Sequence, residues 1–187
     1  MNVNKELQKA SGSLQKNNLN EALATYEKIL SKYPMQPLAL KNQAVIYLNQ
    51  KKLAQAELAL EKLSKIEFDL NVIQNLIILK YDLEKIVDSK KYIDILIKYD
   101  KNNYIGQLYK AKIARIEKQY DIGIKVYENL LKDRPNDELT LLNYGFLLNE
   151  SGQYSKAIVV YEQAETINEH NPAVLYNKGV TVMNLTD

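Results

Sequence analysis

The chain has 187 residues, of which 46% are apolar and 26% are charged, so it can bury a substantial core and is not expected to be disordered. Its net charge is only +2 and its basic residues form no stripe, which argues against nucleic-acid binding, and no apolar run is long enough to insert into a membrane. The absence of Cys excludes disulfides and thiolate sites, and the start of the chain lacks a signal peptide's apolar segment, which together favour a cytoplasmic protein.

The first two elements in chain order are helix pairs over residues 3–36 and 37–69. In each pair two amphipathic stretches flank a short polar turn, because apolar residues recur every three or four positions on either side of it. Ala22 of the first pair and Ala56 of the second occupy the same place, 34 residues apart. A fixed period of this length indicates a stack of helix-turn-helix units.

The third pair, 70–103, keeps the period but departs from the pattern. Its eighth residue is Ile77, where most of the other units carry Ala or Gly. Two explanations stay open: the two helices of this pair are splayed apart, or the register assigned to the pair is wrong by one residue.

Two further pairs follow over 104–137 and 138–171, and their Gly123 and Ala157 are again 34 residues apart. Residues 172–187 then have the pattern of a first helix only, which is either a half repeat or a capping helix. The sequence therefore predicts about eleven helices. We expect them to form a single domain that spans residues 1–187.

Small residues recur at two places in the units for a reason of packing. The eighth residues include Ala10, Ala44, Ala111, Gly145 and Gly179, and the twentieth residues are Ala22, Ala56, Ser89, Gly123 and Ala157. Two antiparallel helices approach closely only where side chains are small, so these two positions are expected to face each other. Large residues four places later, such as Tyr26, Tyr127 and Tyr161, are expected to fill the space toward the next pair.

Taken together, these residues resemble the tetratricopeptide repeat (TPR) family. The fifth unit matches the family pattern best, through Leu141, Gly145, Gly152, Tyr154, Ala157, Tyr161 and Ala164. The resemblance covers nearly the whole chain and implies an all-α fold, an α-α superhelical solenoid of tandem TPR helix-turn-helix repeats. In the third unit Lys80 stands where the family carries Tyr, which leaves the local geometry of that pair open.

The resemblance also implies that the first helices of the units line a concave, partner-binding face. The sixth residues of these helices are Gln8, Asn42, Asn75, Tyr109, Asn143 and Asn177. Amide side chains both donate and accept hydrogen bonds, so a row of them can hold the main chain of an extended peptide, as the repeat domains of O-GlcNAc transferases do. The alternative is that Asn is simply common at this position of the family.

Other side chains expected on the same face are basic or aromatic. Lys41, Lys112 and Arg115 supply positive charge. Phe146 and Tyr176 lie one unit apart and are expected to form an aromatic patch that suits an apolar anchor of the partner. The alternative is that these two rings pack between adjacent first helices.

The sequence contains no catalytic, cofactor-binding or metal-binding constellation. His170 is the only His and lies in a turn beside Pro172, as expected for a solvated loop residue. The six Gly form neither a dinucleotide fingerprint nor a phosphate-binding loop. We therefore predict a non-catalytic scaffold or adaptor without cofactor or metal, whose partner is a protein or a peptide.

Two narrower roles stay open beside that one. The chain could be a module that presents substrates to a larger enzyme such as a glycosyltransferase, or a bacterial chaperone for assembly or secretion. The half unit 172–187 carries Leu175, Val182, Met183 and Leu185, more apolar surface than one neighbouring helix needs. We expect either that this surface forms a homodimer, that it meets further chain, or that it is buried against the fifth unit.

Overall fold

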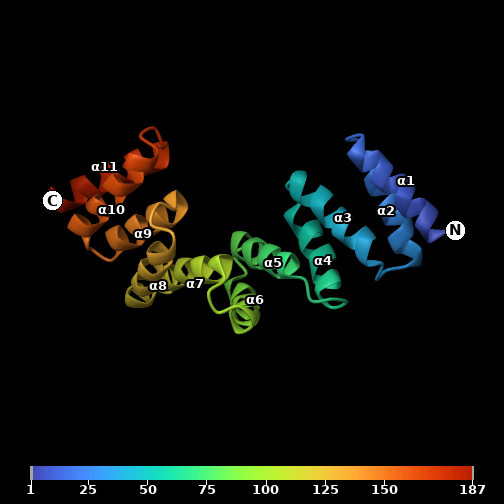
Figure 1. The fold of residues 1–187 in the computed structure, drawn as a ribbon, viewed down its shortest axis with the longest axis horizontal. Helices are drawn as coiled ribbons and strands as arrows, with labels where there is room; N and C mark the ends of the chain where they lie inside the picture. Colours follow the sequence, from blue (N-terminus) through green and yellow to red (C-terminus); the bar gives the residue numbers. More distant parts are fainter. Residues whose placement is uncertain (1, 187) are drawn as a thin grey trace. The chain divides into compact units, whose positions relative to one another are not determined.

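The computed structural model describes residues 2–186, and over that range it consists of eleven helices and no strand (Figure 1). In chain order the helices are α1 (Val3–Gln15), α2 (Leu19–Lys32), α3 (Pro37–Asn49), α4 (Leu53–Ser64), α5 (Leu70–Asp82), α6 (Ile86–Tyr99), α7 (Tyr104–Ile116), α8 (Tyr120–Asp133), α9 (Glu138–Glu150), α10 (Tyr154–Ile167) and α11 (Pro172–Thr186). The all-α prediction is confirmed. Contacts divide the chain into two compact units, Met1–Tyr92 and Ile93–Asp187, which are described separately.

The first unit is held together by packing between helices that are consecutive in the chain. Helices α1 and α2 form one hairpin, α3 and α4 form the next, and α2 contacts α3 as α4 contacts α5. The core between α1, α2 and α3 includes Ala10, Ala22, Tyr26 and Ile29, all fully buried. A second cluster joins α3, α4 and α5, so the buried surface continues from one hairpin to the next.

The second unit follows the same plan. Helices α7 and α8 form one hairpin and α9 and α10 the next, while α11 packs against α10 and α9. Tyr127 and Tyr161, from the second helices of these hairpins, are fully buried. The Tyr127 ring lies 5.8 Å from that of Tyr144 in the next hairpin, whereas the Tyr161 ring lies against Gly145 of its own hairpin. Helix α11 buries Val174 and Thr181 on the side that faces α10 and α9.

One turn geometry joins the two helices of every hairpin. The second residue after the end of each first helix has positive φ, namely Asn17, Lys51, Glu84, Lys118 and Gly152. The amide that follows it donates back to a carbonyl five residues earlier, as Lys52 donates to Tyr47 and Gln153 to Leu148 at 2.9 Å or less. This is a Schellman-type C-terminal cap, in which Gly is the residue without steric cost.

The first helices also begin in one way. Each described N-cap side chain before a first helix accepts a hydrogen bond from an amide of the first turn, at Asn2, Gln36, Asp69, Asn103, Asp137 and Asn171. Such caps satisfy amides that the helix itself leaves without a partner. Their spacing is the period of the repeat, so the cap is part of the repeated unit.

The small residues lie where two helices come close together, but they contact different kinds of neighbour. A Cβ added to Gly123 of α8 would lie 3.4 Å from the carbonyl oxygen of Ala111, so this twentieth residue does face the eighth residue of its pair. Gly145 of α9 instead lies under the ring of Tyr161, where an added Cβ would come within 2.5 Å of Cε1. In the fifth pair the eighth residue is therefore small because a tyrosine covers it.

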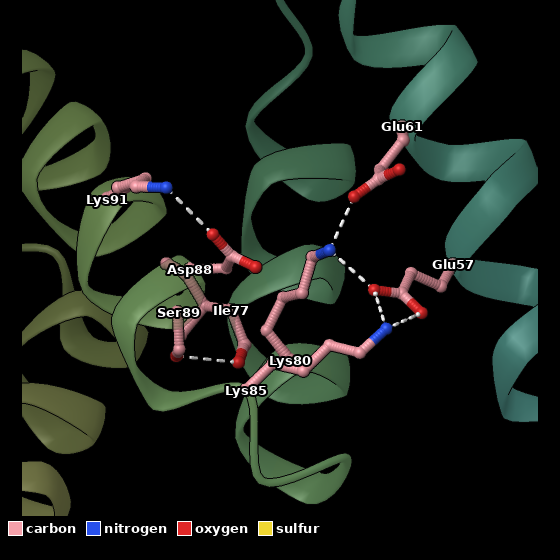
Figure 2. Close-up of polar contacts among 8 residues, drawn as sticks. All are labelled: Glu57, Glu61, Ile77, Lys80, Lys85, Asp88, Ser89 and Lys91. Carbon is pink, nitrogen blue, oxygen red and sulfur yellow. Dashed lines mark hydrogen bonds and ion pairs between the residues drawn. The ribbon is translucent and has the colours of Figure 1, made fainter.

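The atypical third pair keeps this arrangement in α5 and the first part of α6. The hydroxyl of Ser89 donates to the carbonyl oxygen of Ile77 at 3.0 Å, so the twentieth residue again contacts the eighth (Figure 2). Both residues are fully buried. Ser89 and Ile77 have the same relation as Gly123 and Ala111.

Lys80 of the third pair is buried and ion-paired with the preceding hairpin. Its Nζ donates to Glu57 Oε1 at 2.5 Å and also to Glu61 (Figure 2). Lys85 donates to both carboxylate oxygens of Glu57, at 2.8 and 2.7 Å. Burial alone would lower the pKa of Lys80, but the hydrogen bonds and negative charges of Glu57 and Glu61 outweigh it and raise that pKa.

Candidate partner-binding face

The candidate binding site is the outer surface of the first helices, here called the first-helix face. In the first unit it comprises α1, α3 and α5, and in the second unit α7, α9 and α11. Each hairpin buries its first helix against its second, so side chains on the other side of the first helix are left for solvent or for a partner. The predicted site residues all belong to these helices.

A groove lies on this face between α1 and α3. It has a volume of about 450 Å³ and is lined by Asn4, Leu7, Gln8, Ser11, Gly12, Gln15 and Leu38. No lining side chain carries a charge, and the polar side chains are the amides of Asn4, Gln8 and Gln15 and the hydroxyl of Ser11. An added Cβ at Gly12 would meet no atom within 4 Å, so the helix surface there is open. The groove can therefore receive a chain that brings its own hydrogen-bonding groups close to α1.

Asn42 of α3 makes an internal contact beside this groove. Its Nδ2 donates to the hydroxyl of Tyr26 at 2.8 Å, and the same hydroxyl lies 3.3 Å from Ser11 Oγ. Tyr26 is fully buried, so its hydroxyl needs a partner inside the protein. The amide nitrogen of Asn42 thus satisfies the protein's own core and is not simply presented to a partner.

Asn75 and Lys41, the other predicted residues of the first unit, lie on different helices. Asn75 is half-buried on α5. Lys41 of α3 forms an ion pair of 3.3 Å with Asp69, the N-cap of α5. Burial alone would raise the pKa of Asp69, but hydrogen bonds from the Asn71 amide and from Lys41 outweigh it and lower that pKa.

In the second unit, Asn143 and Asn177 donate to their own helices. Asn143 Nδ2 donates to the carbonyl of Leu139 at 2.7 Å, and Asn177 Nδ2 donates to that of Ala173 at 2.8 Å. These bonds use one of the two N–H groups of each amide, so the amide oxygen and the second N–H remain available in each side chain. The Asn row therefore contains two local geometries. Asn143 and Asn177 bond to the backbone of their own helices, whereas Asn42 bonds to the hydroxyl of Tyr26.

Tyr109 and Lys112 of α7 form a cation–π contact. Tyr109 occupies the sixth position of α7, and only 8% of its surface is exposed. The Nζ of Lys112 lies 4.5 Å from the centre of its ring. Lys112 therefore covers Tyr109, and its positive charge is the feature of this pair nearest to solvent.

Arg115, Phe146 and Glu150 form a second cluster that links α7 to α9. The guanidinium of Arg115 lies 4.8 Å from the centre of the Phe146 ring. Its Nη1 also donates to both carboxylate oxygens of Glu150, at 3.0 and 3.1 Å. Phe146 is half-buried under this contact, whereas Tyr176 on α11 is 71% exposed. The two rings predicted to act as one patch thus differ strongly in accessibility.

The sequence pattern predicts only Gln8 of the residues that line the groove on α1, because Gln8 is the sixth residue of its helix. Gln15 carries no feature that marks it in the sequence. Gly12 is the signal that the sequence does offer, since Gly is unfavourable within a helix and no neighbouring atom requires it here. Among residues 2–186, no group of three or more His, Asp or Glu side chains is placed to hold a metal ion. None of the helices described is long and apolar enough to cross a membrane.

Two family models match the sequence. The model of the TPR repeat matches residues 145–185, and the model of the coatomer epsilon subunit matches residues 5–128. No curated protein matches the chain. The two matched ranges together reach from α1 to α11.

Several solved structures have the same fold. YrrB, described as a TPR protein with an unusual peptide-binding site, is 17% identical, with a TM-score of 0.78 over 93% of this chain and 90% of YrrB. PilW, a type IV pilus biogenesis factor, is 19% identical, with a TM-score of 0.78 over 98% of this chain and 86% of PilW. A TPR protein from Parabacteroides merdae is 17% identical, with a TM-score of 0.77 over 99% of this chain and 73% of its own.

Proposed function

We propose that this chain binds a peptide segment of a partner protein. The chain belongs to the tetratricopeptide repeat family and, through residues 5–128, to the family of the coatomer epsilon subunit. The resemblance seen in the sequence is thereby confirmed. A TPR-type fold supports a protein-interaction scaffold, and solved structures with this fold include a protein described by its peptide-binding site. The finer proposal concerns which surface of this chain holds the segment and how.

The observation that carries the proposal is the groove between α1 and α3. Its amides, from Asn4, Gln8 and Gln15, can both donate and accept, which matches the alternating N–H and C=O groups of an extended main chain. Gly12 lets that main chain approach the helix closely. The groove contains no charged side chain, so it favours a segment whose side chains at this point are small and uncharged.

The rest of the first-helix face adds selectivity in this proposal. In the second unit, Lys112 offers a positive charge above Tyr109, and Tyr176 offers an exposed ring. Arg115 is already bonded to Glu150, so we assign it to holding α7 and α9 together. Asn143 and Asn177 contribute their amide oxygens as acceptors. Asn75 and Lys41 remain candidates for contacts at the α3–α5 end of the first unit.

The test is to fill the groove without disturbing the fold. Twelve-residue peptides would be selected by display on the full chain, and their affinity measured for the wild type and for Gly12→Leu. A Cβ added at position 12 meets no atom within 4 Å, and Leu replaces Gly within a helix, so the variant should be at least as stable as the wild type. We expect an affinity loss of about tenfold or more, because the Leu side chain displaces contacts worth at least about 1.4 kcal/mol.

Two matched variants make this test specific. Gly12→Ala gives most of the same helix stabilisation with little added volume, so it should retain binding. Gln8→Ala/Gln15→Ala removes two amides and should weaken binding, whereas Gln55→Ala, an exposed amide on α4, should not. If peptides bind as tightly to Gly12→Leu as to the wild type, the groove is not the site.

Two narrower roles stay hypotheses from the sequence. Presentation of substrates to an enzyme such as a glycosyltransferase, and assembly or secretion in a bacterium, would both use the same peptide-binding face. The likeness to PilW is one of fold, at 19% identity, and the coatomer epsilon subunit is by name one part of a larger assembly. The role favoured here is therefore that of a non-catalytic scaffold.

A further inference from the structure

The two turns that join consecutive hairpins in the first unit carry exposed apolar side chains. The turn between α2 and α3 contains Tyr33 and Met35, and the turn between α4 and α5 contains Ile66 and Phe68. In both turns these residues stand three places and one place before the N-cap of the next helix. All four side chains, here called the apolar edge, belong to residues that are between 37% and 53% exposed.

The second unit forms the equivalent turns with polar residues. The residues three places and one place before the N-caps of α7, α9 and α11 are Asp100 and Asn102, Arg134 and Asn136, and Asn168 and His170. An apolar residue just before an N-cap can pack on the fourth residue of the helix, yet about half of Met35 and of Phe68 stays exposed. The turn itself therefore does not require the apolar edge.

The two turns of the apolar edge lie side by side. Lys41, in the second turn of α3, forms an ion pair of 3.3 Å with Asp69, the N-cap of α5. The beginnings of α3 and α5 are therefore close together, and so are the turns that lead into them. Figure 1 shows both turns at the same edge of the first unit, at the lower ends of α2 and α4 as drawn.

Lysines lie close behind the apolar edge, toward the ends of α2 and α4. Residues 28–35 and 62–68 contain four lysines and one glutamate, and all four lysines are exposed. The Nζ of Lys32 lies 5.8 Å from the centre of the Tyr33 ring. In the segment before α11, by contrast, residues 163–170 contain two glutamates and no lysine. Positive charge and exposed apolar side chains thus occur together in the first unit.

We propose that the apolar edge binds the surface of an anionic lipid bilayer. Attachment of this kind needs apolar side chains that enter the boundary between headgroups and acyl chains, and lysines that stay at the charged surface. The two turns offer both in that order, because the apolar side chains stand at the tips and the lysines behind them. The four apolar side chains come from two separate turns, and a fluid bilayer receives them without a matching shape.

The first experiment places a fluorescent reporter in the apolar edge. The chain contains no Trp, so Phe68→Trp and the control Val159→Trp each carry a single indole. Val159 is an exposed residue of α10, outside the apolar edge. With vesicles of phosphatidylcholine and phosphatidylserine, the emission of Phe68→Trp should shift to shorter wavelength because the indole leaves water. The emission of Val159→Trp should not shift, and vesicles of phosphatidylcholine alone should shift neither.

The second experiment exchanges the apolar residues for those of the second unit. Co-sedimentation with the same vesicles compares the wild type with Met35→Asn/Phe68→His, which introduces the residues that the chain uses before the N-caps of α9 and α11. The chain already forms this turn with such residues, so the variant should fold normally. We expect it to bind at least about tenfold more weakly, because each side chain loses much of its apolar transfer free energy.

Charge variants test the electrostatic part of the proposal. Lys28→Gln and Lys62→Gln should each weaken binding about fivefold, and Glu67→Gln should strengthen it. Lys51→Gln/Lys52→Gln removes two charges from the turn at the opposite end of α3 and should have a smaller effect, because salt screens charges far from the bilayer.

This inference goes beyond the proposed peptide binding, and the two can fail separately. Gly12→Leu should leave vesicle binding unchanged, and Met35→Asn/Phe68→His should leave the affinity for display-selected peptides unchanged. The proposal is overturned if phosphatidylserine vesicles do not bind the wild type, or if they bind the double variant equally well. It is also overturned if the double variant instead loses peptide affinity or a self-association measured by sedimentation, because the apolar edge would then be a protein contact.

Discussion

One substitution at equivalent positions should have opposite effects, because Gly145 and Gly179 occupy the same place in neighbouring first helices. At Gly145 an added Cβ would overlap three ring atoms of Tyr161, at 2.5, 2.7 and 2.9 Å. Tyr161 is fully buried, so its ring has no free space into which to move. At Gly179 the same methyl group would enter open space.

The magnitudes follow from two terms. Replacing Gly by Ala within a helix stabilises the protein by about 1 kcal/mol, and this term applies at both positions. Overpacking a closed core costs about 1–3 kcal/mol, and the three overlaps place Gly145→Ala near the upper end of that range. The free energy of unfolding should therefore fall by about 1–2 kcal/mol in Gly145→Ala and rise by about 1 kcal/mol in Gly179→Ala.

Urea unfolding of the two single variants beside the wild type measures both changes. For a chain of this size, 1 kcal/mol corresponds to about 2–4 °C in Tm, so the two variants should also melt at clearly different temperatures. If both variants gain stability, Tyr161 does not cover Gly145 as described. If both lose stability, Gly179 does not lie in open space as described.

Two further predictions concern the turns and the buried ion pairs. Lys51→Gly and Lys118→Gly should each raise the free energy of unfolding by about 0.5–1 kcal/mol in urea unfolding, because φ is 56° and 57° there, whereas Gly152→Ala should lower it. Burial raises the pKa of Glu57, but hydrogen bonds from Lys80 and Lys85 outweigh it and lower that pKa below the ordinary 4.5. The stability that Glu57 contributes is therefore present above about pH 4.5 and is lost as the pH falls through its lowered pKa. Glu57→Gln should be less stable than the wild type by about 3 kcal/mol at pH 7, and unfolding titrations at lower pH should show that gap closing.

Much of the fold could be predicted because its signals are local. Apolar residues at helical spacing, with Ala22, Ala56, Gly123 and Ala157 at a fixed period, identify helices and the places where they approach. The observed first helices begin at Val3, Pro37, Leu70, Tyr104, Glu138 and Pro172, at intervals close to that period. The turns and the helix caps recur with the same spacing as the small residues. The local conformation that each segment favours is therefore the one that the stacked hairpins require.

The candidate site was harder to predict because its chemistry depends on long-range contacts. Asn42, Asn143 and Asn177 have the same place in the repeat, yet one bonds to Tyr26 and two bond to their own helices. Nothing in a single helix shows which of these geometries will form.

Lys80 shows why a departure from a repeat should be examined together with the preceding hairpin. Taken by itself, a Lys in place of Tyr would weaken the third repeat, because a buried ammonium without a partner is very costly. Glu57 and Glu61 of α4 supply two carboxylates to it, and Lys85 completes the charge balance. The partners lie 19 and 23 residues from Lys80 in the sequence, so they belong to the previous unit of the repeat. The ion pairs join α5 to α4, and they couple the atypical pair to its neighbour at the point where the sequence pattern alone indicates a defect.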